Sequence, residues 1–311
     1  MKTIQIFIHR LTVIALTGTM LLGLLTPAYA QQFPDYSLYN NNHQLINPAY
    51  TGTRGNMSFT AGYRKQWAGV NGAPTTLSFA GQAYLPKFRV GLGLSGWQYT
   101  AGAVKQTAVY TAYSYRLDFE KFKLNFGLQA GFLNNRTNYA GANLNGIIDP
   151  AFANDVNETN FNLGTGVMLY NDTYYVGFSA PVLLTYEGDA NSQIKMSQEF
   201  VLTGGYLFSL TPEITLKPNA FVKFQSSSPT TYNLAANAYY NKKFGFGMMY
   251  KSQKTLAFLA DLILDESFYI GYAYDIPGGA DISADISGSH EFCITYVLKS
   301  KAGEKAPVRL Y

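Results

Sequence analysis

The chain has 311 residues, of which only 14% are charged, and its formal net charge is +4. Such a small basic excess argues against a nucleic-acid partner, which would call for a dense basic patch. A soluble domain usually carries about 25% charged residues, so few charges together with many aromatics and glycines fit a barrel that is apolar outside and polar inside.

The first 30 residues have the pattern of a secretory signal peptide. Lys2 lies in a positive region before a long apolar stretch, and Ala28-Tyr29-Ala30 provides a small-residue cleavage site. The alternative is a membrane anchor, but the apolar stretch is shorter than the ~20 residues that a spanning helix needs. We therefore predict a signal peptide at 1–30 and a mature chain that begins at Gln31.

Residues 31–56 contain turn signals rather than a strand pattern. Asn-Pro and Thr-Gly both occur in Asn47-Pro48-Ala49-Tyr50-Thr51-Gly52, and each favours an ordered turn. We predict that 31–56 is a periplasmic turn segment that plugs or braces the periplasmic mouth of the barrel.

Residues 57–299 alternate apolar and polar side chains with a period of two. In the clearest stretch, Phe126 and Leu128 alternate with Gly127 and Gln129. This period places the two sets on opposite faces of a strand, so the apolar set suits lipid and the polar set suits a lumen. We predict an all-β fold, a transmembrane antiparallel β-barrel of about 14 strands. The strands are expected at 57–67, 74–85, 88–98, 105–118, 121–134, 161–170, 173–181, 197–210, 213–226, 231–242, 244–251, 254–263, 266–275 and 290–299.

The lengths of the connections favour a barrel that crosses a membrane. Every even-numbered connection is tight, as at Pro86-Lys87, whereas the odd-numbered connections 135–160, 182–196 and 276–289 are long. The short odd-numbered connection at 251–254 is an exception. Bacterial barrels have short periplasmic turns and longer external loops, so we predict that both termini are periplasmic. Tyr and Phe gather at the tight turns, as in a membrane-interface girdle, although both residues also favour strands in general.

The long loops and the cysteine content bear on metal binding. Asp281 and Asp285 alternate within 276–289, and such acids in a flexible loop can hold Ca²⁺. Solvated loop side chains are the simpler interpretation, so we expect no metal site. Cys293 is the only cysteine, which excludes a disulfide framework and a cysteine-based zinc site.

Two motifs place charges on adjoining strands. The first is Tyr63-Arg64-Lys65-Gln66-Trp67, and the second is Gly288-Ser289-His290-Glu291. An unpaired buried charge is costly, so a lumenal Arg64 needs an acidic partner. The first and last strands are neighbours in a closed barrel, which makes Glu291 the candidate. The alternative is that both side chains point separately into lumenal water.

No constellation of residues points to catalysis. The predicted mature chain has two histidines, His43 and His290. His290 follows Ser289, but adjacent residues on a strand point to opposite faces, so they do not form a nucleophile and its base. Nucleotide-binding and zinc-protease motifs are absent from the sequence. We therefore expect a non-enzymatic protein with no catalytic residues and no cofactor.

Taken in order, these motifs resemble the PorP/SprF family. The resemblance rests on the Asn-Pro-Ala-Tyr-x-Gly turn, the Tyr-Arg-x-Gln-Trp segment and the late Gly-Ser-His-Glu strand, and it spans essentially the whole mature chain. The candidate family-motif residues are Asn47, Pro48, Gly52, Tyr63, Arg64, Gln66, Trp67, Gly288, His290 and Glu291.

The resemblance implies a component of the type IX secretion and gliding-motility machinery in the outer membrane of Bacteroidota. It implies a role in the secretion or surface retention of adhesin-like cargo, and contacts with periplasmic components of the machinery. Outer-membrane lipid is a further expected partner. Residues 300–311 follow the last strand as a tail, which is either a periplasmic contact segment or disordered.

Two alternatives remain from the strand pattern alone. A 14-strand barrel is wide enough to conduct or to need filling, so a passive channel or an apolar-solute transporter is the alternative function. A soluble secreted β-protein such as a lectin is the third possibility, and it would not need detergent for extraction.

Overall fold

The computed structural model describes residues 34–138, 155–187, 195–226, 228–264, 267–278 and 287–298. The predicted signal peptide and the tail at 300–311 lie outside the described residues. So do the acidic positions Asp281 and Asp285 of the proposed Ca²⁺ alternative. Among the described residues, no helix is both long and apolar enough to cross a bilayer.

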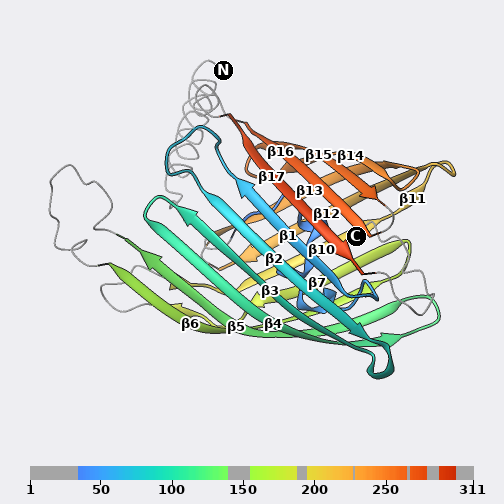
Figure 1. The fold of residues 1–311 in the computed structure, drawn as a ribbon, viewed down its shortest axis with the longest axis horizontal. Helices are drawn as coiled ribbons and strands as arrows, with labels where there is room; N and C mark the ends of the chain where they lie inside the picture. The colour runs from blue at the N-terminus through green and yellow to red at the C-terminus, as the bar shows by residue number, and fades with distance from the viewer. Residues whose placement is uncertain are drawn as a thin grey trace, which may run out of the picture. The chain divides into compact units, whose positions relative to one another are not determined.

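Fourteen antiparallel strands form one closed barrel (Figure 1). In chain order they are β1 (Ser58–Lys65), β2 (Thr75–Leu85), β3 (Val90–Ala101), β4 (Val104–Asp118), β5 (Lys123–Thr137), β6 (Val156–Tyr170), β7 (Tyr174–Val182), β10 (Glu199–Tyr206) with its short continuation β11 (Phe208–Ser209), β12 (Ile214–Gln225), β13 (Ser228–Tyr240), β14 (Phe244–Lys251), β15 (Thr255–Leu264), β16 (Phe268–Pro277) and β17 (Ser289–Val297). Neighbours in the chain pair with one another, and β1 pairs with β17 to close the ring. The connection from β7 to β10 carries a separate ribbon of β8 (Tyr186–Glu187) and β9 (Lys195–Met196).

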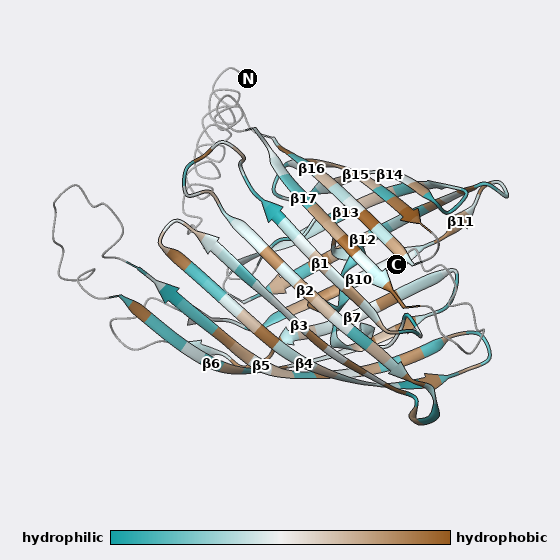
Figure 2. Ribbon diagram, in the orientation of Figure 1, coloured by the Kyte–Doolittle hydropathy of each residue, from teal (hydrophilic) through white to brown (hydrophobic). Residues whose placement is uncertain are grey.

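The alternation of the sequence becomes the two faces of the barrel wall. On β5, Phe126 and Leu128 are 49% and 62% exposed on the outside, whereas Asn125 and Gln129 are 1% and 5% exposed. Figure 2 shows that hydrophobic and hydrophilic residues also follow one another along the other strands. An outer face of aromatic and aliphatic side chains suits a bilayer. The predicted fold is therefore confirmed.

Most of the strand bounds agree with the prediction within three residues. The largest difference is β6, which begins at Val156 rather than at 161. At the start of β6 the alternation of apolar and polar residues stops, but the strand still pairs with β5. Polar side chains also connect the two strands there, since Asn134 donates hydrogen bonds to Asn157 and Thr159. The longer strands leave only two residues between β3 and β4 and between β12 and β13, so the expected contrast between odd and even connections is weaker than the sequence predicts.

The two ends of the barrel differ in the connections that they carry. The turn end carries the connections 86–89, 119–122, 171–173 and 241–243, the start of β1 and the end of β17. The loop end carries the connections 66–74, 102–103 and 252–254, the ends of β7 and β16 and the starts of β10 and β17.

Residues 34–56, the lumenal segment, lie inside the barrel. Ser37 bonds to Glu291 near the loop end, and Gly52 bonds to Gln82 near the turn end. The segment therefore runs along the lumen before it enters β1. It contains three short 3₁₀ helices, η2 (Tyr39–Asn41), η3 (His43–Leu45) and η4 (Pro48–Tyr50). The sequence predicts a turn segment at one mouth, whereas the structure places its beginning in the loop-end half. The polar inner face of the barrel explains why the segment extends so far, since its side chains can form hydrogen bonds with backbone groups all along the lumen.

Candidate functional site: the filled lumen

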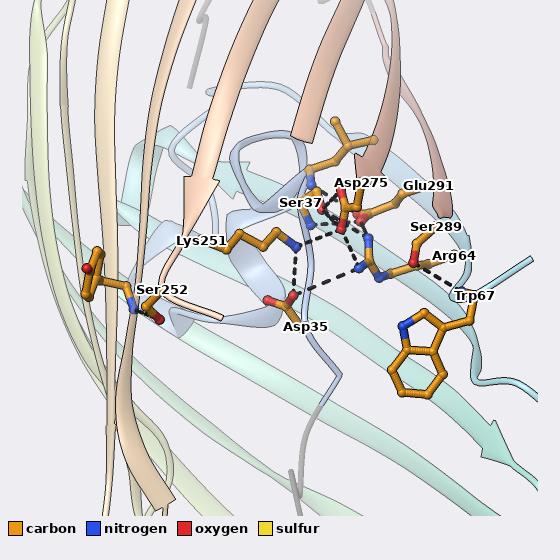
Figure 3. Close-up of polar contacts among 11 residues, drawn as sticks. Asp35, Ser37, Arg64, Trp67, Lys251, Ser252, Asp275, Ser289 and Glu291 are labelled. Carbon is orange, nitrogen blue, oxygen red and sulfur yellow. Dashed lines mark hydrogen bonds and ion pairs between the residues drawn. The ribbon is translucent and has the colours of Figure 1, made fainter. Parts of the chain in front are cut away.

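A buried guanidinium joins β1 to the last two strands (Figure 3). Arg64 is 3% exposed, and its two terminal nitrogens donate to Glu291 Oε2 at 2.9 Å and to Asp275 Oδ2 at 2.7 Å. Strand register explains the pairing, because Arg64 lies directly opposite Glu291. The predicted pair of Arg64 and Glu291 is confirmed, and the alternative of two separate lumenal charges is wrong.

Two further groups complete this charged cluster, defined as Asp35, Arg64, Lys251, Asp275 and Glu291. Lys251 Nζ lies 2.7 Å from Asp35 Oδ2 and 3.0 Å from Asp275 Oδ2. Burial raises the pKa of the Asp35 carboxyl, but the Lys251 and Arg64 cations outweigh burial and hold that pKa below its usual value. Asp35 is therefore ionised at neutral pH, and it ties the lumenal segment to β14.

The charged cluster also holds the backbone of the lumenal segment. The backbone N–H groups of Ser37 and Leu38 donate to the two Glu291 oxygens at 2.8 and 3.1 Å. Ser37 Oγ donates to Asp275 at 2.7 Å and accepts from Arg64 at 3.0 Å. A buried pair with such additional hydrogen bonds is expensive to break on one side, at about 3–5 kcal/mol.

At the turn end the lumenal segment is held by neutral groups. Asn47 caps η4, because its Oδ1 accepts from Ala49 N at 2.9 Å while its Nδ2 donates to Val167 O at 3.2 Å. Gly52 adopts a φ of +78° and donates its N–H to Gln82 at 2.7 Å. Pro48 occupies the first helical position, where its missing N–H costs nothing.

Glycines of the barrel wall allow the backbone of the lumenal segment to lie close to the strands. A Cβ on Gly127 would overlap the backbone of η4, a Cβ on Gly166 would overlap Asn47, and a Cβ on Gly91 would overlap Thr51. The turn-end half therefore fits the segment by shape. Sequence patterning predicts small lumenal residues on these strands, but it does not say which of them face the segment.

His43 lies between the two ends, packed against the rings of Tyr39, Tyr50 and Tyr175 at 5.1–5.8 Å. It is 1% exposed, and neither ring nitrogen has a hydrogen-bond partner among the described residues. Burial, helped by the Lys217 and Arg54 cations, lowers the pKa of His43 to about 3. The ring is therefore neutral, and it serves as packing rather than as a base.

Other predicted site residues lie at the loop end but outside the lumen. Tyr63 faces outward, and His290 Nδ1 lies 2.9 Å from the Tyr272 hydroxyl. Trp67 is 41% exposed, and its backbone N–H donates to Ser289 Oγ at 3.2 Å.

The connection 66–74 lies beside the residues that precede β17. Gln66 N donates to Pro74 O, and Gly288 O accepts from Ala68 N at 2.8 Å. The structure thus brings Arg64, Gln66, Trp67, Gly288, His290 and Glu291 to one end of the barrel. Asn47, Pro48 and Gly52 lie toward the other end. Asp35, Lys251 and Asp275 were not predicted as site residues, although the period of two places Asp275 on the polar face of its strand.

A sequence model of the family described as type IX secretion system membrane protein PorP/SprF matches residues 28–296. No curated protein matches the chain.

Several solved barrels are similar in structure at low identity. The toluene transporter TbuX of Ralstonia pickettii is 15% identical, with a TM-score of 0.47, over 81% of this chain and 92% of that chain. A FadL homologue of Pseudomonas aeruginosa is 11% identical, with a TM-score of 0.48, over 88% and 96%. Omp33 of Acinetobacter baumannii is 7% identical, with a TM-score of 0.46, over 78% and 99%.

Proposed function

The chain belongs to the PorP/SprF family of type IX secretion system membrane proteins, and from this premise we propose that it is a sealed, non-enzymatic barrel that aids the secretion or surface retention of adhesin-like cargo. A closed antiparallel barrel from a family of membrane proteins is an outer-membrane protein. Outer-membrane lipid would cover the exposed apolar face.

One observation carries the proposal, namely that the lumenal segment fills the barrel. Tyr39, Ala49 and Tyr50 are at most 2% exposed inside the wall. A pore needs a continuous aqueous path, and this segment is bonded to the wall at both ends. A filled barrel fits a role in holding or anchoring proteins better than it fits passive solute transfer.

Partners of such a barrel must engage its ends, because lipid covers the outer wall. The loop end presents an ordered connection at 66–74 with Trp67 and Val70 exposed. The proposal assigns adhesin-like cargo to this end and periplasmic components of the secretion and gliding-motility machinery to the turn end. The short turns, the start of β1 and the end of β17 lie at the turn end.

Deletion of the gene in its native host tests the role. Surface display of a specific adhesin-like cargo should fall, as measured by antibody labelling of intact cells, while uptake of small solutes stays unchanged. Display should return with the wild-type gene. Normal display together with impaired solute uptake would contradict the proposal and favour the passive channel.

Single-channel recording of the purified barrel tests the seal. The wild-type protein should conduct little, whereas a variant that lacks residues 35–53 should open a stable pore. A variant that lacks 301–311 serves as the control, because this deletion leaves the lumenal segment in place. Robust conductance by the wild-type barrel would overturn the sealed state.

A further inference from the structure

A small cavity lies in the loop-end half of the lumen, beside the charged cluster. Its volume is about 30 Å³, and its wall includes Pro34, Tyr36, Trp97, Tyr110, Gln129 and Glu199. These residues come from the lumenal segment and from four different strands. A space of this size accepts one or two water-sized groups. The cavity therefore suits the head of a small ligand rather than a whole solute.

Three oxygens of this cavity lining have no hydrogen-bond partner among the described residues. They are the Tyr36 hydroxyl, the Tyr110 hydroxyl and Glu199 Oε2, and all three are buried. Glu199 is 6% exposed and Tyr110 is 5% exposed. Buried polar groups in native proteins are nearly always bonded, so three such oxygens around one cavity point to a donor that occupies it.

The local charge indicates which kind of donor fits. Glu199 lies near the Lys223 cation, but Lys223 Nζ is 3.8 Å from Glu199 Oε2, which is too long for a hydrogen bond. The ion pairs beside the cavity and in the charged cluster join the carboxylates of Asp35, Glu199, Asp275 and Glu291 to the cations of Arg64, Lys223 and Lys251. These groups have one negative charge in excess.

Cations in the other half of the lumen lie against aromatic rings. Arg54 stacks on Tyr269 and Lys217 on Tyr239, both in the turn-end half, where the Tyr239 hydroxyl also bonds Asp261. A buried excess of charge is costly unless it is paired, so the loop-end half favours one additional positive charge.

We propose that the cavity binds a primary ammonium group through Glu199 and the hydroxyls of Tyr36 and Tyr110. An ammonium has three N–H donors and no acceptor, which matches three unpartnered oxygens. The aromatic rings of Trp97 and Tyr110 add a favourable surface for a cation. The larger, planar guanidinium group does not fit a space of this size. The site is independent of the secretion role.

Trp97 provides the readout for the test. The chain has two tryptophans, and Trp67→Phe leaves Trp97 as the only one, on the wall of the cavity. The purified barrel in detergent is titrated with n-butylammonium chloride, with 1-butanol and with KCl. The expected result is a saturable change in tryptophan emission with n-butylammonium alone. An equal response to 1-butanol or K⁺, or no saturable response, overturns the proposal.

Variants identify the oxygens involved. In the Trp67→Phe background, Glu199→Gln should weaken n-butylammonium binding by about tenfold or more, because a charge-assisted hydrogen bond is lost. Glu213→Gln, on an exposed acid at the turn end, should leave binding unchanged. Tyr110→Phe keeps the ring and removes an unbonded hydroxyl, so it tests the site even if Glu199→Gln fails to fold. Unchanged affinity in Tyr110→Phe overturns the proposal.

The ammonium can come from a free amine or from a lysine side chain of a protein. A short capped peptide with one lysine, compared with its norleucine counterpart, separates the two sources. Saturable binding of the lysine peptide supports a protein ligand, and binding of n-butylammonium alone supports a small amine. Equal binding of the lysine and norleucine peptides contradicts ammonium recognition.

Discussion

The two halves of the lumen hold the same segment by different physical means. In the loop-end half, Arg64, Lys251 and two carboxylates, those of Asp275 and Glu291, bind residues 35–38 through charged hydrogen bonds. In the turn-end half, amide and hydroxyl groups bind residues 47–52, and wall glycines admit the backbone. The loop-end attachment depends on a few side chains, each of them costly to lose. The turn-end attachment is spread over many neutral contacts and depends on shape.

The largest expected effect is the loss of the Arg64 guanidinium. Arg64→Met leaves Glu291 and Asp275 buried without this partner, which should lower the free energy of unfolding by about 3–5 kcal/mol. Thermal unfolding in detergent measures the change. Arg89→Met, on an exposed arginine at the turn end, should change stability by less than about 0.5 kcal/mol.

A double variant separates the ion pair from its surroundings. Arg64→Met combined with Glu291→Gln should destabilise the barrel by less than the sum of the single changes. The reason is that the double variant removes both charges of the pair, so neither of them is left buried without the other. Additive effects would show that Arg64 and Glu291 are not coupled. In that case the contrast between a charged half and a neutral half would fail.

The second effect is a dependence on pH that arises from His43. The pKa of His43 is lowered to about 3 in the folded barrel, so between pH 6.5 and 3 the unfolded chain binds a proton that the folded chain does not. Stability should therefore fall as the pH drops through this window, by about 1.4 kcal/mol per unit below pH 6.5. Between pH 6.5 and 4.5 the carboxyl of Asp35 stays ionised, because its pKa lies below its usual value.

His43→Phe tests this assignment. The variant keeps an aromatic ring against Tyr39, Tyr50 and Tyr175 and removes the titrating group. Its unfolding midpoint should vary less between pH 6.5 and 4.5 than that of the wild type. An identical pH dependence in both proteins would assign the effect to another group.

The third effect tests the fit by shape. Gly127→Ala places a methyl group against the backbone of η4 and should destabilise the barrel by about 1–3 kcal/mol through overpacking. Gly204→Ala is the matched control, because the nearest atom to its Cβ would lie at an ordinary 3.6 Å. Equal stability of the two variants would mean that η4 shifts at little cost to accommodate the added methyl group.

The sequence predicted the wall better than its contents, for a physical reason. A period of two is a local property, so it located fourteen strands and put Arg64 and Glu291 on the lumenal faces of neighbouring strands, where the observed register sets them opposite each other. The path of residues 34–56 depends on contacts with residues far along the chain, as between Ser37 and Asp275. Turn signals at Asn47-Pro48 identified an ordered segment, but they carried no information on where it lies. Lys251 and Asp275 gain their roles only when Asp35 enters the lumen.

The smallest expected effect is that of Asn47→Ala. The change removes the cap of η4 and leaves Ala49 N and Val167 O without this partner, which should cost about 0.5–2 kcal/mol. Hydrogen exchange measured by mass spectrometry then distinguishes the two halves. In Asn47→Ala the amides of 49–53 should exchange faster while those of 37–38 stay protected, and Arg64→Met should show the reverse pattern. If either variant exposes both ends together, the lumenal segment is released as one unit, and the two attachments are coupled through its 3₁₀ helices.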